Sequence, residues 1–204
     1  DSALPFVGEL NHIDIGFTRK QLCKVEQQIF KITYHDIKKI QLPSLPKNIH
    51  KYKRGRTLII AGSEKYQGAA YLALRGAISS GAGYISAILP ELVARSIYQV
   101  APEIVVKSTM ESDDKGNSYL FNALKNTDLS SYDSLVIGPG IGLNDDDWQK
   151  SIEYFLTFKG ILILDADALN RISQSKLGSN FFLERKFKTW ITPHSKEFLR
   201  LFPG

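Results

Sequence analysis

The pattern of apolar and polar residues becomes regular from residue 57 onwards, where two periods alternate. Leu58–Ile60 is a short continuous apolar run, which is typical of a strand buried on both faces of a sheet. From Ala69 to Ser80, small residues recur at three- and four-residue steps, which predicts a helix that can lie close to a sheet or a ligand. Tyr84–Leu89 is the next apolar run. This unit of strand, glycine-containing loop, helix and strand predicts a binding site at the carboxyl end of its first strand.

The same alternation of strands and helices continues along the chain and predicts an α/β fold. We expect a mostly parallel sheet with helices on both faces, formed by residues 47–204. Residues 1–46 are less regular and are interpreted as an N-terminal extension or interdomain junction, with a weak strand pattern at 10–16. The strands are predicted at 58–61, 84–89, 104–108, 134–137, 161–164 and 190–191, and the helices at 69–80, 91–100, 119–125, 145–158, 168–172 and 196–202.

Composition and charge favour a globular protein that binds small anionic ligands. Hydrophobic residues make up 43% of the 204 residues, which is enough for a sizeable core. The formal charge of +5 is spread along the chain, without the basic blocks typical of DNA or RNA binding. With Cys23 as the single cysteine and no apolar run of about 20 residues, we expect a cytoplasmic protein that neither forms disulfides nor spans a membrane. Because the sequence begins at Asp1 without an initiating methionine, it is interpreted as a piece of a longer chain.

A glycine-rich loop at 138–142, with the sequence GPGIG, follows the predicted strand 134–137. Its three glycines allow positive φ angles and a close approach of the backbone to a ligand. The alternative is a tight turn between strand and helix in which the glycines serve geometry alone. The sequence leaves both interpretations open.

Two acidic residues, Asp165 and Asp167, follow the predicted strand 161–164. Carboxylates at the mouth of a buried strand suit a site that handles magnesium or phosphate. The alternative is that Asp167 caps the next helix while Asp165 bonds nearby backbone. We favour the cap for Asp167 and a functional role for Asp165.

The segment 192–197, TPHSKE, is the third loop that follows a predicted strand. Ser195 is a plausible helix N-cap, and Glu197 lies in the first turn, so capping accounts for both residues. Capping does not account for His194, which is predicted on the same sheet edge as the other two loops. His194 is therefore a candidate for ligand contact.

Four segments in order resemble the motifs of one protein family. They are GSEKYQGAAYLALRGAISSGAG at 62–83, VIGPGIG at 136–142, LDADALN at 164–170 and TPHSKEFLRLF at 192–202. The family is that of the ADP-dependent NAD(P)H-hydrate dehydratases, and the likeness covers residues 47–204.

This resemblance implies a ribokinase-like fold and a role in nicotinamide nucleotide repair. The implied enzyme is a lyase that converts (6S)-NAD(P)H hydrate to NAD(P)H at the expense of ADP, or of ATP, with Mg²⁺ and through a phosphorylated intermediate. Phosphate is a far better leaving group than hydroxide, which explains the need for a donor. The opening at 8–16 also resembles the junction that follows an epimerase domain in bifunctional members, so a fused or separate epimerase domain is implied as a partner. A homo-oligomer is expected.

The resemblance also implies roles for particular residues. Ala69, Gly142 and His194 are implied as contacts to the hydrated nucleotide. Asp165 and Glu197 are implied as support for phosphate or metal, and no residue is assigned firmly as a metal ligand.

One part of the family pattern is missing from the sequence. The Gly-Asp dipeptide that supplies the family's catalytic base occurs nowhere in this chain, so the catalytic Asp is expected beyond Gly204 and the domain is expected to be incomplete at its C-terminal end. Two alternatives stay open: a kinase of the same superfamily acting on a small vitamin-precursor alcohol, and a non-catalytic nucleotide-binding fragment.

Overall fold

The computed structural model describes residues 16, 18, 20, 33–40 and 49–203. The chain divides into two units, Asp1–Ser44 and Leu45–Gly204. In the first unit, helix α2 spans Tyr34–Lys39, and Asp36 accepts hydrogen bonds from the amide and hydroxyl of its N-cap residue Thr33. The predicted strand at 10–16 lies outside the described residues, apart from Gly16.

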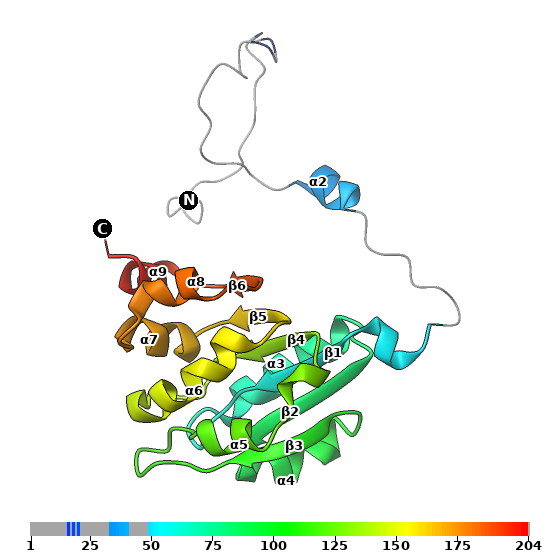
Figure 1. Ribbon diagram of the computed structural model, residues 1–204. Helices are drawn as coiled ribbons and strands as arrows, with labels where there is room; N and C mark the ends of the chain where they lie inside the picture. Colours follow the sequence, from blue (N-terminus) through cyan, green and yellow to red (C-terminus); the bar gives the residue numbers. More distant parts are fainter. Residues whose placement is uncertain (1–15, 17, 19, 21–32, 41–48, 204) are drawn as a thin grey trace, which may run out of the picture. The chain divides into compact units, whose positions relative to one another are not determined.

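The second unit is built on a sheet of six parallel strands (Figure 1). Its spatial order is β3-β2-β1-β4-β5-β6, so the order reverses between β1 and β4. Adjacent strands are in parallel register, with Ile60 of β1 opposite both Ile88 of β2 and Ile137 of β4. The strands span Arg56–Ile60 (β1), Tyr84–Pro90 (β2), Val105–Met110 (β3), Ser134–Ile137 (β4), Ile161–Leu164 (β5) and Thr189–Ile191 (β6).

Helices connect successive strands, as parallel pairing requires. The α-helices of this unit span Gln67–Ser79 (α3), Glu91–Val100 (α4), Phe121–Lys125 (α5), Asp145–Thr157 (α6), Asp167–Gln174 (α7), Phe181–Glu184 (α8) and Ser195–Leu201 (α9). Short 3₁₀ turns lie at Lys51–Arg54, Leu129–Ser131 and Gly178–Asn180. Of these helices, α8 is absent from the sequence-based prediction, because its four residues are too few to establish a period.

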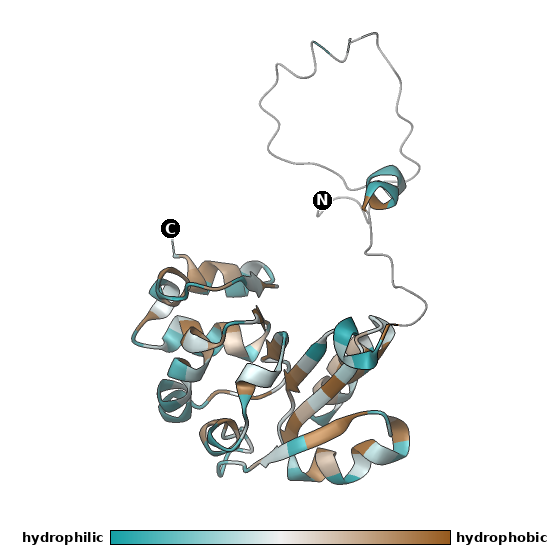
Figure 2. Cartoon of the chain, turned by 45° about the vertical axis from the view of Figure 1, so that its right-hand side comes forward, coloured by the Kyte–Doolittle hydropathy of each residue, from teal (hydrophilic) through white to brown (hydrophobic). Residues whose placement is uncertain are grey.

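Alternate residues of β1 enter two separate apolar cores. Leu58 and Ile60 belong to the core beneath α5, α6 and α7, whereas Ile59 and Ala61 belong to the core beneath α3 and α4. The helices therefore change face at the same point at which the strand order reverses. In Figure 2 the central strands are mostly brown, and teal gathers on the helices that flank them. The continuous apolar runs in the sequence are explained by this burial on both faces.

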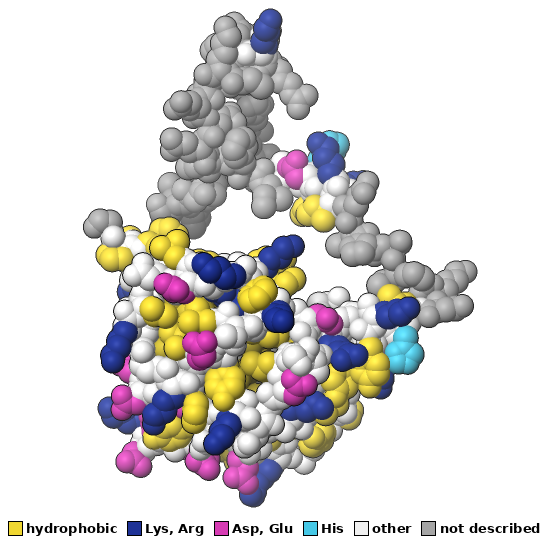
Figure 3. Space-filling view, viewed as in Figure 1, with side chains coloured by type: hydrophobic (Ala, Val, Ile, Leu, Met, Phe, Trp, Pro, Cys, Tyr) yellow, Lys and Arg dark blue, Asp and Glu magenta, His cyan; other side chains and the backbone are white. Residues whose placement is uncertain are grey.

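The structure confirms the predicted α/β class with a parallel sheet and helices on both faces. The six predicted strands and six predicted helices are present, with ends that differ by two residues at most. Among the described residues, no helix is both long and apolar enough to cross a membrane. On the face visible in Figure 3, basic and acidic side chains of this unit are interspersed, as expected from the spread of charge along the sequence.

Candidate functional site

The reversal of strand order between β1 and β4 is the place where open parallel sheets bind ligands, outside the carboxyl ends of the strands. The loop after β1 and the loop after β4 meet there, because the amide of Gly62 donates to the carbonyl of Pro139 at 2.8 Å. Gly138 donates to Ile60 at 3.3 Å and continues the strand pairing into the loop. These two loops form the centre of the candidate site.

Ala69 lies in the first turn of α3 and faces the glycine-rich loop. A methyl group built at Gly140 would lie 2.7 Å from Cβ of Ala69. The loop and α3 can pack this closely only because residue 140 is a glycine. Gly140 also has a φ of +67°, which few L-residues adopt. The small residues predicted on α3 are thus explained by close packing at this loop, and contact of Ala69 with a substrate stays a prediction.

Gly142 is fixed by the protein at both of its backbone polar atoms. Its amide donates to Oδ2 of Asp167 at 2.9 Å, and its carbonyl accepts from Nε of Arg171 at 2.6 Å. Its φ is +73°, and a Cβ at this position would collide with the side chain of Asn117. The amide of Gly142 is therefore engaged within the protein, and contact of Gly142 with a substrate stays a prediction.

The two acids after β5 have different partners. Oδ1 of Asp165 accepts from the amide of Ala166 at 2.9 Å and from the hydroxyl of Thr192 at 2.8 Å, which ties the loop after β5 to the loop after β6. The capping role favoured for Asp167 is wrong. Ala166 occupies the N-cap position of α7 with a φ of +48°, and Asp167 bonds Gly142 instead.

The loop after β6 places His194, and not Ser195, at the N-cap of α9. Nδ1 of His194 accepts from the amide of Lys196 at 3.1 Å, so the proton of the neutral ring lies on Nε2, 3.2 Å from Oε1 of Glu197. The other Glu197 oxygen accepts from the amide of His194 at 3.0 Å. Glu197 is buried and completes a capping box, whereas the His194 side chain is 61% exposed and accessible to a ligand.

The predicted site residues are distributed along one edge of the sheet. Ala69 and the loop that contains Gly142 meet at the reversal point, and Asp165 follows on the adjacent strand β5. His194 and Glu197 follow β6, which is one strand further from the reversal point. The order of the strands therefore places Asp165 between the two groups, one strand from the loop of Gly142 and one strand from the loop of His194.

The described residues do not form a magnesium site by themselves. No group of three or more His, Cys, Asp and Glu side chains gathers in a way that could hold a metal ion within this part of the chain. Asp165 and Glu197 have partners at the oxygens described above. Mg²⁺ prefers several oxygen ligands in an octahedron, so these residues could supply part of its shell at most.

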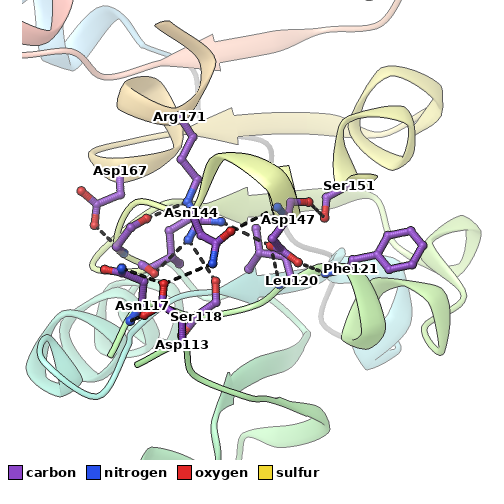
Figure 4. A network of polar contacts seen from close by, with 12 residues as sticks. Asp113, Asn117, Ser118, Leu120, Phe121, Asn144, Asp147, Ser151, Asp167 and Arg171 are labelled. Carbon is purple, nitrogen blue, oxygen red and sulfur yellow. Dashed lines mark hydrogen bonds and ion pairs between the residues drawn. The ribbon is translucent and has the colours of Figure 1, made fainter. Parts of the chain in front are cut away.

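A buried polar network behind the glycine-rich loop is absent from the sequence-based prediction (Figure 4). At its centre Arg171 is fully buried and bonds the loops after β3 and β4, together with Asp147 in the first turn of α6. Burial lowers the pKa of Arg171 to about 10, against the opposing charge of Asp147, so the group is still protonated at neutral pH. The sequence signal that could have indicated this network is the spacing of Asp167 and Arg171, which puts the two side chains one helical turn apart on α7.

A family model described as NAD(P)H-hydrate dehydratase matches residues 57–204, which is most of the second unit.

Similar curated proteins include the bifunctional NAD(P)H-hydrate repair enzyme Nnr of Synechocystis sp., which is 34% identical over the whole chain. The ATP-dependent (S)-NAD(P)H-hydrate dehydratase of Nematostella vectensis is 29% identical over 79% of the chain. The chain spans 38% of the first protein and 44% of the second, so it corresponds to less than half of either.

Similar solved structures include an ADP/ATP-dependent NAD(P)H-hydrate dehydratase of Bacillus subtilis, crystallised with ATP and Mg²⁺. It is 30% identical, with a TM-score of 0.60 over 78% of this chain and 51% of that one. A ribokinase-like superfamily protein of Enterococcus faecalis is 27% identical, with a TM-score of 0.61 over the same shares. The fold is therefore ribokinase-like.

Proposed function

Because this chain belongs to the NAD(P)H-hydrate dehydratase family, we propose that it acts in nicotinamide nucleotide repair. The proposed reaction converts (6S)-NAD(P)H hydrate to NAD(P)H at the expense of ADP or ATP, which makes the protein a hydro-lyase. The observation that carries the proposal is the meeting of Ala69 with the glycine-rich loop at the strand-order reversal, within the segment that matches the family. Small residues on both sides let α3 and the glycine-rich loop pack closely at this point.

The proposed chemistry balances as two steps. The substrate hydroxyl attacks the terminal phosphoryl group of the donor, which leaves AMP from ADP or ADP from ATP, and the hydroxyl proton is lost. Loss of inorganic phosphate together with a ring proton then restores the double bond. Mg²⁺ would neutralise charge on the donor, and we propose Asp165 and Glu197 as side chains that support it.

The residue roles follow from the placements above. Ala69 would set the closest approach of the substrate to α3, and Gly142 would support the loop surface that the substrate lies against. His194 is proposed to contact the substrate through the exposed face of its imidazole, because Lys196 and Glu197 engage its two ring nitrogens and fix its orientation. Asp165 and Glu197 would orient polar groups near the transferred phosphate.

The wider setting of the protein belongs to the same proposal. Relatives are named as bifunctional repair enzymes, which supports the presence of an epimerase function on the same polypeptide or on a partner. We further expect a cytoplasmic homo-oligomer.

The experiment is to supply the purified full-length polypeptide with (6S)-NADPH hydrate, Mg²⁺ and either ADP or ATP, and to follow the recovery of NADPH absorbance. Recovery is expected only with a donor, in equal amounts with AMP (or ADP) and inorganic phosphate. Transfer of phosphate to a vitamin-precursor alcohol, without NADPH recovery, would support a kinase instead. Binding of the hydrate without turnover would identify a binding fragment and would contradict the proposed activity for this chain.

A further inference from the structure

We propose that Arg171 is a positioning residue, which together with Asp167 holds the glycine-rich loop after β4 in the conformation that receives the substrate. The inference rests on the proposed function in so far as this loop is where the hydrated nucleotide is placed. It concerns two side chains of α7 that lie one helical turn apart and face the same glycine (Figure 4).

The guanidinium of Arg171 bonds three carbonyl oxygens from two loops. Nε donates to Gly142 at 2.6 Å, while Nη2 donates to Ile141 at 3.1 Å and to Ser118 at 3.0 Å. Ile141 and Gly142 follow β4, and Ser118 belongs to the loop after β3. One side chain therefore joins two loops of the sheet edge to α7, which follows β5.

The remaining contact of Arg171 extends the network into α5 and α6. Nη1 lies 3.4 Å from Oδ2 of Asp147, a carboxylate that also accepts from the amides of Leu120 at 2.7 Å and Phe121 at 3.0 Å. Both charged side chains are almost fully inaccessible to water. A buried ion pair of this kind contributes little net stability compared with an apolar packing of similar volume. Its better-attested use is to specify one arrangement of the chain, which fits a positioning role.

The loop itself requires an external support. Gly138, Gly140 and Gly142 all have positive φ angles, and glycine loses more conformational freedom on ordering than any other residue. Asp167 accepts from the amide of Gly142 while Arg171 donates to its carbonyl, so the last glycine is held from both sides by groups of opposite charge. The start of the loop is held by the loop after β1, and its last glycine is held by α7.

Arginine is required at this position because of the shape of its head group. Its planar fork presents donors in several fixed directions, whereas lysine carries one compact ammonium at the end of a flexible stem. Arg171→Lys would keep the charge beside Asp147 and lose the simultaneous bonds to three carbonyls. The substitution therefore removes positioning while it avoids an uncompensated buried carboxylate.

The chain offers a matched control in Arg185. This second buried arginine also has a pKa lowered to about 10 by burial, and it bonds the carbonyls of Phe155, Phe158 and Gly160, away from the sheet edge. Arg185→Lys is the same chemical change at a buried arginine that bonds backbone carbonyls and the hydroxyl of Thr189. It should lower stability without altering the glycine-rich loop.

The experiment compares the wild-type protein, Arg171→Lys and Arg185→Lys by amide hydrogen exchange at residues 138–144 and by calorimetric titration with (6S)-NADPH hydrate. We expect faster exchange at the loop and roughly tenfold or more weaker binding for Arg171→Lys alone. Asp167→Ala removes the acceptor for the Gly142 amide and should also make amide exchange at the loop faster. This variant replaces Arg171→Lys as the test if Arg171→Lys fails to fold.

The outcomes separate the two proposals. Unchanged loop exchange and affinity in Arg171→Lys would overturn the positioning role, as would equal effects in Arg185→Lys. If the wild-type protein does not bind the hydrate, the proposed function fails for this chain, and loop exchange alone still decides the positioning role.

Discussion

The amide of Gly142 donates a hydrogen bond of 2.9 Å to Oδ2 of Asp167, which joins the loop after β4 to the first turn of α7. Two motifs that lie 25 residues apart in the sequence thus act as one structural unit. The second acid of the LDADALN segment therefore contributes to the candidate site by shaping the loop beside the reversal of strand order. Asp165, the first acid, instead bonds Thr192 in the loop after β6.

Gly142→Ala should destabilise the protein by about 1–3 kcal/mol, because alanine at a φ of +73° is strained and its methyl group would collide with Asn117. The measurement is chemical denaturation of the wild type, Gly142→Ala, Asn117→Ala and the double variant. Part of the cost comes from the collision, so the double variant should be more stable than the sum of the single changes predicts. Simple additivity would show that Asn117 is not what restricts this position.

Ala166→Gly should stabilise the protein by about 1 kcal/mol, because Ala166 has a φ of +48° and ψ of −118° that glycine adopts with less strain. Ala168→Gly, two residues later inside α7, is the control and should destabilise by about 1 kcal/mol or more. Urea unfolding of the three proteins gives both values. A loss of stability in Ala166→Gly would mean that the strain is not present in solution.

His194→Asn should separate the capping role of this residue from its role toward the substrate. Asparagine is a favoured N-cap, so the melting temperature should stay close to that of the wild type, whereas the bond between the ring and Glu197 is lost. Affinity for the hydrated nucleotide should fall. His194→Ala should lose both the N-cap and the affinity for the substrate, and the lost cap should lower the free energy of unfolding by about 1 kcal/mol. Unchanged affinity in both variants would exclude His194 from the binding site.

Asp113 should make the free energy of unfolding of the protein depend on pH in the acid range. Burial pushes the pKa of Asp113 upward, but hydrogen bonds from Asn117, Lys115 and Asn144 outweigh it, and the net pKa lies below the ordinary value of 3.8. The unfolded state therefore binds more protons as the pH falls through this range, so stability is complete at neutral pH and is lost toward the folded pKa. Asp113→Asn should flatten this acid limb in denaturation curves at pH 2–6. An equally steep limb in the variant would contradict the assignment.

Local patterns predicted most of the fold. The run at 58–60 is apolar because both faces of β1 are covered, whereas β4 and β5 alternate between buried and partly buried residues. The small-residue face of α3 was also visible, although its main explanation is the close approach of Gly140 to Ala69. Helix ends were harder to predict, because neighbouring residues can both serve as N-cap. At α9 the sequence favoured Ser195, whereas the structure has His194.

The parts of the candidate site that were missed depend on long-range pairing. Nothing near Arg171 in the sequence reveals that it would be buried beside Asp147, or that three carbonyls from distant loops would surround it. The cap predicted for Asp167 failed for the same reason, since its partner Gly142 is brought near only by the pairing of β4 with β5. The local preference of aspartate for the N-cap position is overridden here by the hydrogen bond between Asp167 and Gly142.

The central claim is that the hydrated nicotinamide nucleotide lies at the reversal of strand order, against the surface formed by the loop after β1 and the glycine-rich loop after β4. Its most direct test is an amide-resolved NMR titration of the isotopically labelled protein with (6S)-NADPH hydrate. The account predicts saturable shifts concentrated at residues 62–70 and 138–142, with smaller ones at 192–195. Saturable shifts confined to the opposite edge of the sheet, around Tyr84 and Lys107, would contradict it.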